Sequence, residues 1–226
     1  MTTRTARFLT GSLLLLSATS LSLHSSAQSL AQANFNAAES CSALSNLNIL
    51  DTRITLTEIV NQNSFTVPGT DNVMQAPAFC RLVGMTTPAV NFEVWLPLSG
   101  WNGNYQSVGN GGMAGTISYA SMANALRRGY ATASTDTGHE AGPISFDASW
   151  ASGRPDLIED FGHRALHLTT VNAKQVTEAF YSAPPDYSYY VGCSKGGQQG
   201  LMEAQRYPND FDGIIAGDPA NNWTRF

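Results

Sequence analysis

The chain has 226 residues, of which 42% are hydrophobic and 13% are charged, and its formal net charge is −5 at pH 7. This composition is typical of a globular protein and excludes a disordered or fibrous one. The acidic balance argues against binding to nucleic acid, whose phosphates attract basic surfaces. The length suffices for one α/β domain with a substantial core.

The N-terminal segment has the pattern of a secretory signal peptide. Two arginines precede a mostly apolar run over residues 8–23, and small residues that suit cleavage follow it, with the cut after Ala27 or alternatively after Ala31. Polar residues interrupt the apolar run, so it falls short of a comfortable membrane span. We expect residues 1–27 to be a signal and residues 28–226 to be a periplasmic or extracellular domain with no membrane attachment.

Three cysteines occur in the chain. Cys41 and Cys80 bracket the first segment of the mature protein, and we predict that a disulfide bond joins them, since export permits such bonds. Cys193 is then left without a partner. An odd cysteine in a secreted protein indicates a free thiol, an intermolecular link, or a partner on sequence that the chain lacks.

The first predicted strands lie in the middle of the chain. Residues 82–85 and 92–98 read as strands, and Pro88 in the turn between them predicts an antiparallel pair at one edge of a sheet. A turn signal and a short strand over residues 105–108 follow. The loop 109–112, Gly-Asn-Gly-Gly, comes directly after that strand.

The second half alternates helices with strands. Expected are a helix over 118–128 stopped by Gly129, a strand over 130–134, irregular residues 140–158, a helix over 161–181, a strand over 188–193, a helix to about 207 and a short buried strand over 213–217. This alternation predicts an α/β fold with a mostly parallel, doubly wound sheet covered on both faces. The chain stops just after a strand, where such a sheet would normally continue.

Ser194 lies in a Gly-x-Ser-x-Gly sequence between an aromatic, β-branched run and a helix-capable segment. This is the nucleophile-elbow pattern, in which a strained turn holds the serine hydroxyl out at the top of a sheet. The alternative is an ordinary turn serine whose glycines serve only the backbone. A phosphate-binding loop is excluded because the residue order that it requires is absent.

A serine nucleophile needs N–H donors for the oxyanion that forms on attack. The backbone N–H of Lys195 is one candidate, since it lies at the start of the following helix. The second donor usually comes from a glycine-rich loop after an earlier strand, which favours Gly112, with Gly111 beside it. The alternative is that this loop is a plain turn.

The base for Ser194 is not evident. A nucleophile-elbow enzyme orders its triad as Ser, then Asp or Glu, then His, and no histidine follows Ser194. The acids that follow it are Asp210, Asp212 and Asp218.

Beyond the predicted signal, three histidines precede the serine. His139 ends a predicted strand and could line a pocket. His163 and His167 have the spacing of two metal ligands on one helix face, but no third ligand is evident, so we predict a surface or packing role and no metal site. Asp136 and the Lys195 side chain read as loop and surface residues.

Taken together, the motifs resemble the tannase and feruloyl esterase family of secreted α/β-hydrolases. The matching blocks are FEVWLP (92–97), WNG (101–103), VGNGG (108–112), TDTGH (135–139), GCSKGG (192–197), GLMEAQRYP (200–208) and FDGIIAG (211–217). They cover nearly everything after the signal and are more specific together than the elbow alone.

The resemblance implies an α/β-hydrolase fold that hydrolyses an aromatic carboxylic ester, with Ser194 as nucleophile and Lys195 and the glycine loop as oxyanion hole. It also implies a disulfide from Cys193 to a cysteine beside the catalytic histidine. The family's Asp, His and lid domain with a calcium site lie C-terminal to the matched region, so we expect this chain to be an N-terminal portion, without a cofactor of its own and with its sheet incomplete.

Two other interpretations remain open. The chain could be a catalytically inert module that binds aromatic esters or a partner without turnover. It could also be an enzyme that recruits His139 or His163 as its base. The expected partner is in each case a small aromatic ester, and neither its identity nor an oligomeric state is predicted.

Overall fold

The computed structural model describes residues 35–142 and 146–222. The predicted signal over residues 1–27 lies outside them. Within this part of the chain, no helix combines the length and the apolar character needed to cross a membrane.

A seven-stranded mixed sheet forms the centre of the fold, in the order β1-β4-β5-β7-β6-β8-β9. Its strands are β1 (Thr52–Val60), β4 (Phe79–Thr86), β5 (Val90–Pro97), β6 (Asn104–Val108), β7 (Ala131–Thr135), β8 (Tyr187–Cys193) and β9 (Gly213–Gly217). The pairs from β7 through β6 and β8 to β9 are parallel, whereas β1, β4, β5 and β7 pair antiparallel. An α/β sheet was predicted correctly, but "mostly parallel" was wrong.

The short connections of the first strands explain the difference. Only three residues separate β4 from β5, and such a link can join antiparallel strands but not parallel ones. The predicted β4–β5 hairpin is confirmed, with Arg81 opposite Trp95. It is not at the sheet edge, because β1 pairs along the far side of β4. The prediction missed β1, although its threonines and isoleucines are strand formers.

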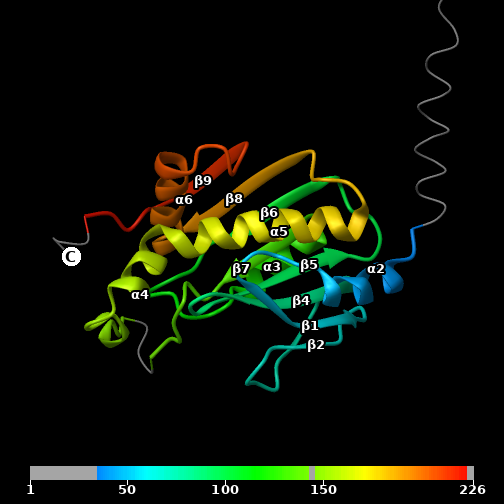
Figure 1. Cartoon of the computed structure of the whole chain (residues 1–226), viewed down its shortest axis with the longest axis horizontal. Helices are drawn as coiled ribbons and strands as arrows, with labels where there is room; N and C mark the ends of the chain where they lie inside the picture. The colour runs from blue at the N-terminus through cyan, green and yellow to red at the C-terminus, as the bar shows by residue number, and fades with distance from the viewer. Residues whose placement is uncertain (1–34, 143–145, 223–226) are drawn as a thin grey trace, which may run out of the picture. The chain divides into compact units, whose positions relative to one another are not determined.

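Helices lie on both faces of the sheet (Figure 1). They are α2 (Ala37–Ala43), α3 (Tyr119–Arg127), α4 (Pro155–Glu159), α5 (Ala165–Tyr181) and α6 (Lys195–Arg206), with 3₁₀ turns at Leu44–Asn46 and Ser149–Ala151 and a π-helical turn at Asp160–Arg164. A small hairpin adds β2 (Phe65–Thr66) and β3 (Val73–Met74). Residues 140–158 were expected to be irregular, but the structure has helical turns at Ser149–Ala151 and Pro155–Glu159. Pro155 fits there because the first helical turn needs no N–H from it.

Two apolar layers hold the helices to the sheet. One layer packs Ala173, Val176 and Phe180 of α5 against β4, β5, β6 and β7. The other packs Met122 and Leu126 of α3 against β5 and its neighbours. The predicted Cys41–Cys80 disulfide is confirmed and ties α2 to β4 beside the first layer.

The last strand differs from its prediction. No residue of β9 is buried, and Ile215 is 63% exposed. Among the described elements, β9 has a strand neighbour on one side only, and the helix that packs against it is α6. The face of β8 and β9 turned away from α6 therefore remains open, so the sheet is not covered on both faces throughout.

Candidate active site

Ser194 sits at the junction of β8 and α6 in a backbone conformation that L-residues rarely adopt, with φ 58° and ψ −118°. Two backbone hydrogen bonds hold this conformation in place. The N–H of Ser194 donates to the carbonyl of Gly217, and the carbonyl of Ser194 accepts from the N–H of Ala220. The side chain is exposed. A strained serine held out between a strand and a helix is the geometry that the motif predicts.

Glycines make this turn possible by removing side chains from it. A Cβ on Gly192 would lie 2.6 Å from the carbonyl carbon of Gly196. A Cβ on Gly197 would lie 2.4 Å from the carbonyl oxygen of Gly217. Real Cβ atoms do not approach backbone so closely, so any larger residue at either position would push α6 away from the strands.

The glycine-rich loop after β6 lies against the start of α6. The N–H of Gly196 donates to the carbonyl of Asn110 over 2.8 Å, and the N–H of Gly109 donates to the carbonyl of Val191 over 3.0 Å. Gly111 has open space around it, and Gly112 has φ +55°. The structure thus brings the loop and the serine turn together, as their order along the chain suggested.

A buried amide pair fixes this contact. Gln199 of α6 accepts the Asn110 backbone N–H through Oε1 and donates through Nε2 to Asn110 Oδ1, at 3.0 and 2.9 Å. Asn110 also donates to the carbonyls of Thr116 and Thr135. From the sequence, Asn110 was recognised only as part of the glycine-rich loop and Gln199 was not singled out, since 89 positions separate the two residues.

The Lys195 side chain was expected at the surface and is instead only 1% exposed. Its Nζ lies 3.4 Å from the ring centroid of Phe161 and donates to the Phe161 carbonyl over 2.7 Å and to Gln198. Burial lowers the pKa of Lys195 to about 7. The side chain therefore anchors the start of α6 to the turn that precedes α5.

Asp136 is also buried, contrary to the prediction of a plain loop residue. Its carboxylate accepts from the backbone N–H and side-chain amide of Asn91 and from the N–H of Gly138. Desolvation raises its pKa to about 6, against the effect of these hydrogen bonds. Asp136 thus joins the end of β7 to the start of β5.

Each of the three described histidines has a hydrogen-bond partner other than Ser194. His139 is 7% exposed, stacks on Trp150 and has Nε2 2.8 Å from the Met113 carbonyl oxygen; burial lowers its pKa. His163 Nδ1 lies 2.7 Å from the Tyr207 hydroxyl. His167 Nδ1 lies 2.6 Å from Asp210 Oδ2. Within residues 35–142 and 146–222, no histidine is hydrogen bonded to Ser194.

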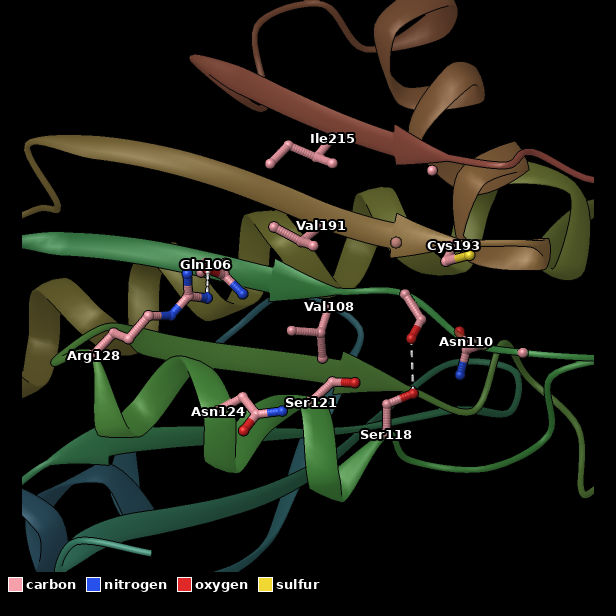
Figure 2. Close-up of a pocket in the computed structure, with 14 residues that line it drawn as sticks. Gln106, Val108, Asn110, Ser118, Ser121, Asn124, Arg128, Val191, Cys193 and Ile215 are labelled. Atoms are coloured by element: carbon pink, nitrogen blue, oxygen red, sulfur yellow. Dashed lines mark hydrogen bonds between the residues drawn. The ribbon is translucent and has the colours of Figure 1, made fainter.

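A pocket of about 530 Å³ opens between α3 and the ends of β6, β8 and β9 (Figure 2). Its walls include Val108, Val191 and Ile215, with Arg128 and Gln106 hydrogen bonded to each other at one end. Cys193 lies at the opposite end, exposed and free. Ser194 is not among the residues that line this pocket, whose walls come equally from the strands and from α3 with the glycine-rich loop.

Comparison with known proteins identifies the family of this chain. A sequence profile described as "Tannase and feruloyl esterase" matches residues 72–226. The chain belongs to this family. An uncharacterized esterase of Xanthomonas campestris pv. campestris is 45% identical over 192 residues, which are 83% of this chain and 33% of that protein.

Solved structures of tannase and feruloyl esterase relatives agree. The chain is similar to feruloyl esterase B from Aspergillus oryzae, with a TM-score of 0.74, 32% identity and coverage of 82% of this chain and 38% of that one. It is also similar to tannin acyl hydrolase from Aspergillus niger, with a TM-score of 0.62, 25% identity and coverage of 87% and 37%. The family resemblance and the α/β-hydrolase-like fold are thereby confirmed. The chain spans about a third of the length of these relatives.

Proposed function

We propose that the protein is a secreted serine esterase whose Ser194 attacks aromatic carboxylic esters of the feruloyl or galloyl type. The observation that carries this proposal is the strained, exposed serine at the start of α6, with the glycine-rich loop packed against the same helix turn. The family membership and the names of the two Aspergillus relatives support the ester class. The Cys41–Cys80 disulfide supports an exported protein.

In the first step, Ser194 Oγ forms a bond to the ester carbonyl carbon and its proton passes to a base. Negative charge then develops on the carbonyl oxygen. We assign its stabilisation to the backbone N–H of Lys195 and that of Gly112, with Gly111 beside it. The N-terminus of α6 favours the same charge through its aligned peptide dipoles. Fixed donors are effective here because they need no reorganisation when the charge appears, and Gln199 and Asn110 hold the loop in place.

In the second step the alcohol leaves with a proton and an acyl-enzyme remains, from which water releases the carboxylic acid. We expect the histidine and acid of the triad on sequence C-terminal to the matched region, because His139, His163 and His167 are engaged elsewhere. Cys193 is then the half-disulfide that would hold that histidine near Ser194.

The test compares the 226-residue chain with the product of the complete gene. Hydrolysis of methyl ferulate and methyl gallate is measured, together with labelling of the serine by a fluorophosphonate. We expect turnover by the complete product, a loss of at least about 1,000-fold in Ser194→Ala, and a similarly slow 226-residue chain. Ser45→Ala, which removes an exposed hydroxyl on the turn Leu44–Asn46, is the matched control and should retain full activity.

Two results would contradict the proposal. Hydrolysis that survives Ser194→Ala would place the nucleophile elsewhere. A complete product that neither hydrolyses these esters nor reacts with the fluorophosphonate would favour the second candidate, an inert module that binds without turnover, which the engagement of all three described histidines also fits.

A further inference from the structure

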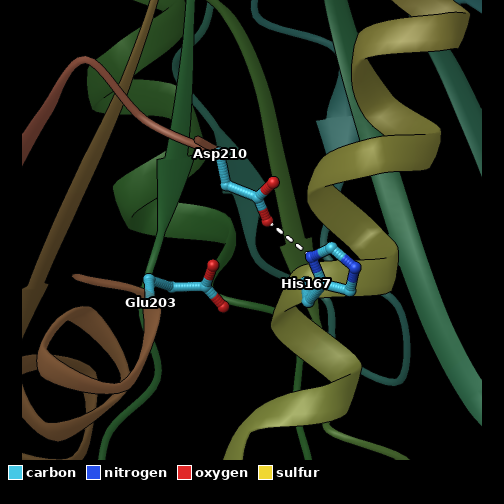
Figure 3. A group of neighbouring side chains, drawn as sticks. All are labelled: His167, Glu203 and Asp210. Atoms are coloured by element: carbon cyan, nitrogen blue, oxygen red, sulfur yellow. Dashed lines mark hydrogen bonds and ion pairs between the residues drawn. The ribbon is translucent and has the colours of Figure 1, made fainter. Parts of the chain in front are cut away.

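A cluster of ionisable side chains lies behind the nucleophile helix, at the end of α6 remote from Ser194. His167 comes from α5, Glu203 from the last turn and a half of α6, and Asp210 from the loop that leads to β9 (Figure 3). One nitrogen or carboxylate oxygen from each residue lies within 4.8 Å of the others. Both carboxylates turn toward the space beside the imidazole.

Glu203 is the unusual member of this cluster. It is 1% exposed, and neither of its carboxylate oxygens has a hydrogen-bond partner. A buried carboxylate without partners is costly, and native proteins provide nearly all such groups with a hydrogen bond or a counter-ion. An unpaired acid that points at a second acid and an imidazole indicates that something between them is missing.

The neighbouring cation does not fill this gap. Lys174 lies two turns along α5 from His167, and its charge acts to lower the pKa of Glu203. Its Nζ, however, donates to the backbone carbonyl of Asp210 and not to a carboxylate. Tyr207 stacks on the His167 ring at 3.8 Å and its hydroxyl is bonded to His163. Tyr105, from β6, brings only a neutral hydroxyl with a raised pKa to this region.

The donor set favours one class of ion. An imidazole nitrogen with two carboxylate oxygens is a ligand set that zinc accepts, with water in a fourth position. Calcium fits poorly, since its ligands are oxygens and usually number six or more. His167 is 29% exposed through its side chain, so solvent reaches the imidazole side of the cluster.

We propose that His167, Glu203 and Asp210 bind a divalent zinc ion that joins α5, the nucleophile helix α6 and the loop before β9. On binding, the ion takes the place of the hydrogen bond between His167 Nδ1 and Asp210 Oδ2, the proton of that bond is released to solvent, and the three ligand atoms draw together around the ion. Its role is structural, since it fixes the far end of the helix whose first residue supplies the oxyanion donor. This site is independent of the proposed esterase function.

The competing arrangement is a proton shared by the two carboxyl groups. Burial, together with the charge of Asp210, raises the pKa of Glu203 well above its ordinary value, as such sharing would require. Zinc binding and proton sharing predict different responses to added metal and to amide variants, so one set of measurements separates them.

The experiment uses the full chain stripped of metal by a chelator and dialysed into metal-free buffer. Zinc binding is followed by calorimetry and by elemental analysis of the desalted protein, and cobalt is added in parallel for its visible absorption. We expect one zinc per chain, the intense absorption bands of four-coordinate cobalt, and a higher Tm with zinc than with chelator. Glu203→Gln and Asp210→Asn should each weaken zinc binding at least tenfold.

His163→Gln is the matched control, because His163 lies one turn before His167 on the same helix side but bonds to Tyr207. It should bind zinc as the original chain does. The proposal is overturned if the original chain takes up no stoichiometric zinc, or if His163→Gln abolishes zinc binding while Glu203→Gln retains it. It is also overturned if the Tm of the original chain is the same with zinc and with chelator while Glu203→Gln has a higher Tm. If the amide variants do not fold, the zinc stoichiometry and cobalt spectrum of the original chain and of His163→Gln still decide the matter.

Discussion

The two sides of the sheet are built differently. On the β1, β4 and β5 side, strands pair antiparallel, a disulfide ties α2 to β4, and apolar layers cover both faces of β4 and β5, while β1 is the largely exposed edge. On the β6, β8 and β9 side, strands are parallel, polar networks hold the glycine loop to α6, and one face stays open. We expect the first, stable side to contribute most of the stability of the described fold. The second side carries the strained Ser194, and we name it the catalytic side after the role proposed for that serine.

Trp95 provides the largest expected effect on the stable side. It is fully buried, stacks on Phe79 at 4.3 Å and donates from Nε1 to Glu93. Trp95→Ala removes these contacts and leaves a cavity, so we expect a loss of about 3–5 kcal/mol in the free energy of unfolding, measured by urea denaturation. A loss below about 1 kcal/mol would show that this layer does not dominate stability. Trp95→Phe, which preserves most of the ring stacking, serves as the control.

The disulfide is the next test of the same side. It closes a loop with a sequence separation of 39 residues, for which restricting the unfolded chain contributes about 3–4 kcal/mol. The double variant Cys41→Ala/Cys80→Ala should lose about that much stability, and reducing agent should have the same effect on the original chain only. A Tm that is insensitive to reductant would contradict a stabilising bond. Cys193→Ala, which removes a free exposed thiol, is the control with little expected change.

Lys195 tests the catalytic side through pH. Its pKa is about 7 in the folded state, because of burial, and 10.5 as the ordinary value. The unfolded chain therefore binds more protons than the folded one between these values, and stability rises with pH across that window. From pH 7 to 9 we expect this group to raise the free energy of unfolding by on the order of 1 kcal/mol per pH unit. The increase is smaller to the extent that the hydrogen bonds of Lys195 favour its charged form. Unfolding curves of Lys195→Met against the original chain isolate this slope, and equal slopes in both would contradict it.

Much of the catalytic side could be predicted from the sequence, because its geometry depends on local residues. The glycines around Ser194 and the aromatic run before it set the strand, turn and helix within about ten positions. The stable side was predicted less well: β1 carries a period-2 pattern that was not recognised, and its pairing with β4 determines where the sheet ends.

The missed contacts all join residues far apart along the chain. Lys195 is buried and donates to the carbonyl of Phe161, which lies 34 residues before it, and the local sequence around Ser194 gives no sign of this contact. His167 meets its acidic neighbour Asp210 across 43 positions, so the histidine pair showed no third ligand. Local rules of turn and strand do not specify such pairs; they follow from how α5 and α6 pack on the sheet.

Ile215 gives the smallest expected effect and the sharpest test of the open face. It is 63% exposed, whereas Val94 on β5 is fully buried. Ile215→Ser should change the free energy of unfolding of the 226-residue chain by less than about 0.5 kcal/mol. Val94→Ser, the matched change on the stable side, should cost several times more, since it removes two methyl groups and buries a hydroxyl. A loss above about 1 kcal/mol at Ile215 would show that another surface covers β9 in solution. Sedimentation of both proteins would then reveal whether that surface belongs to a second copy.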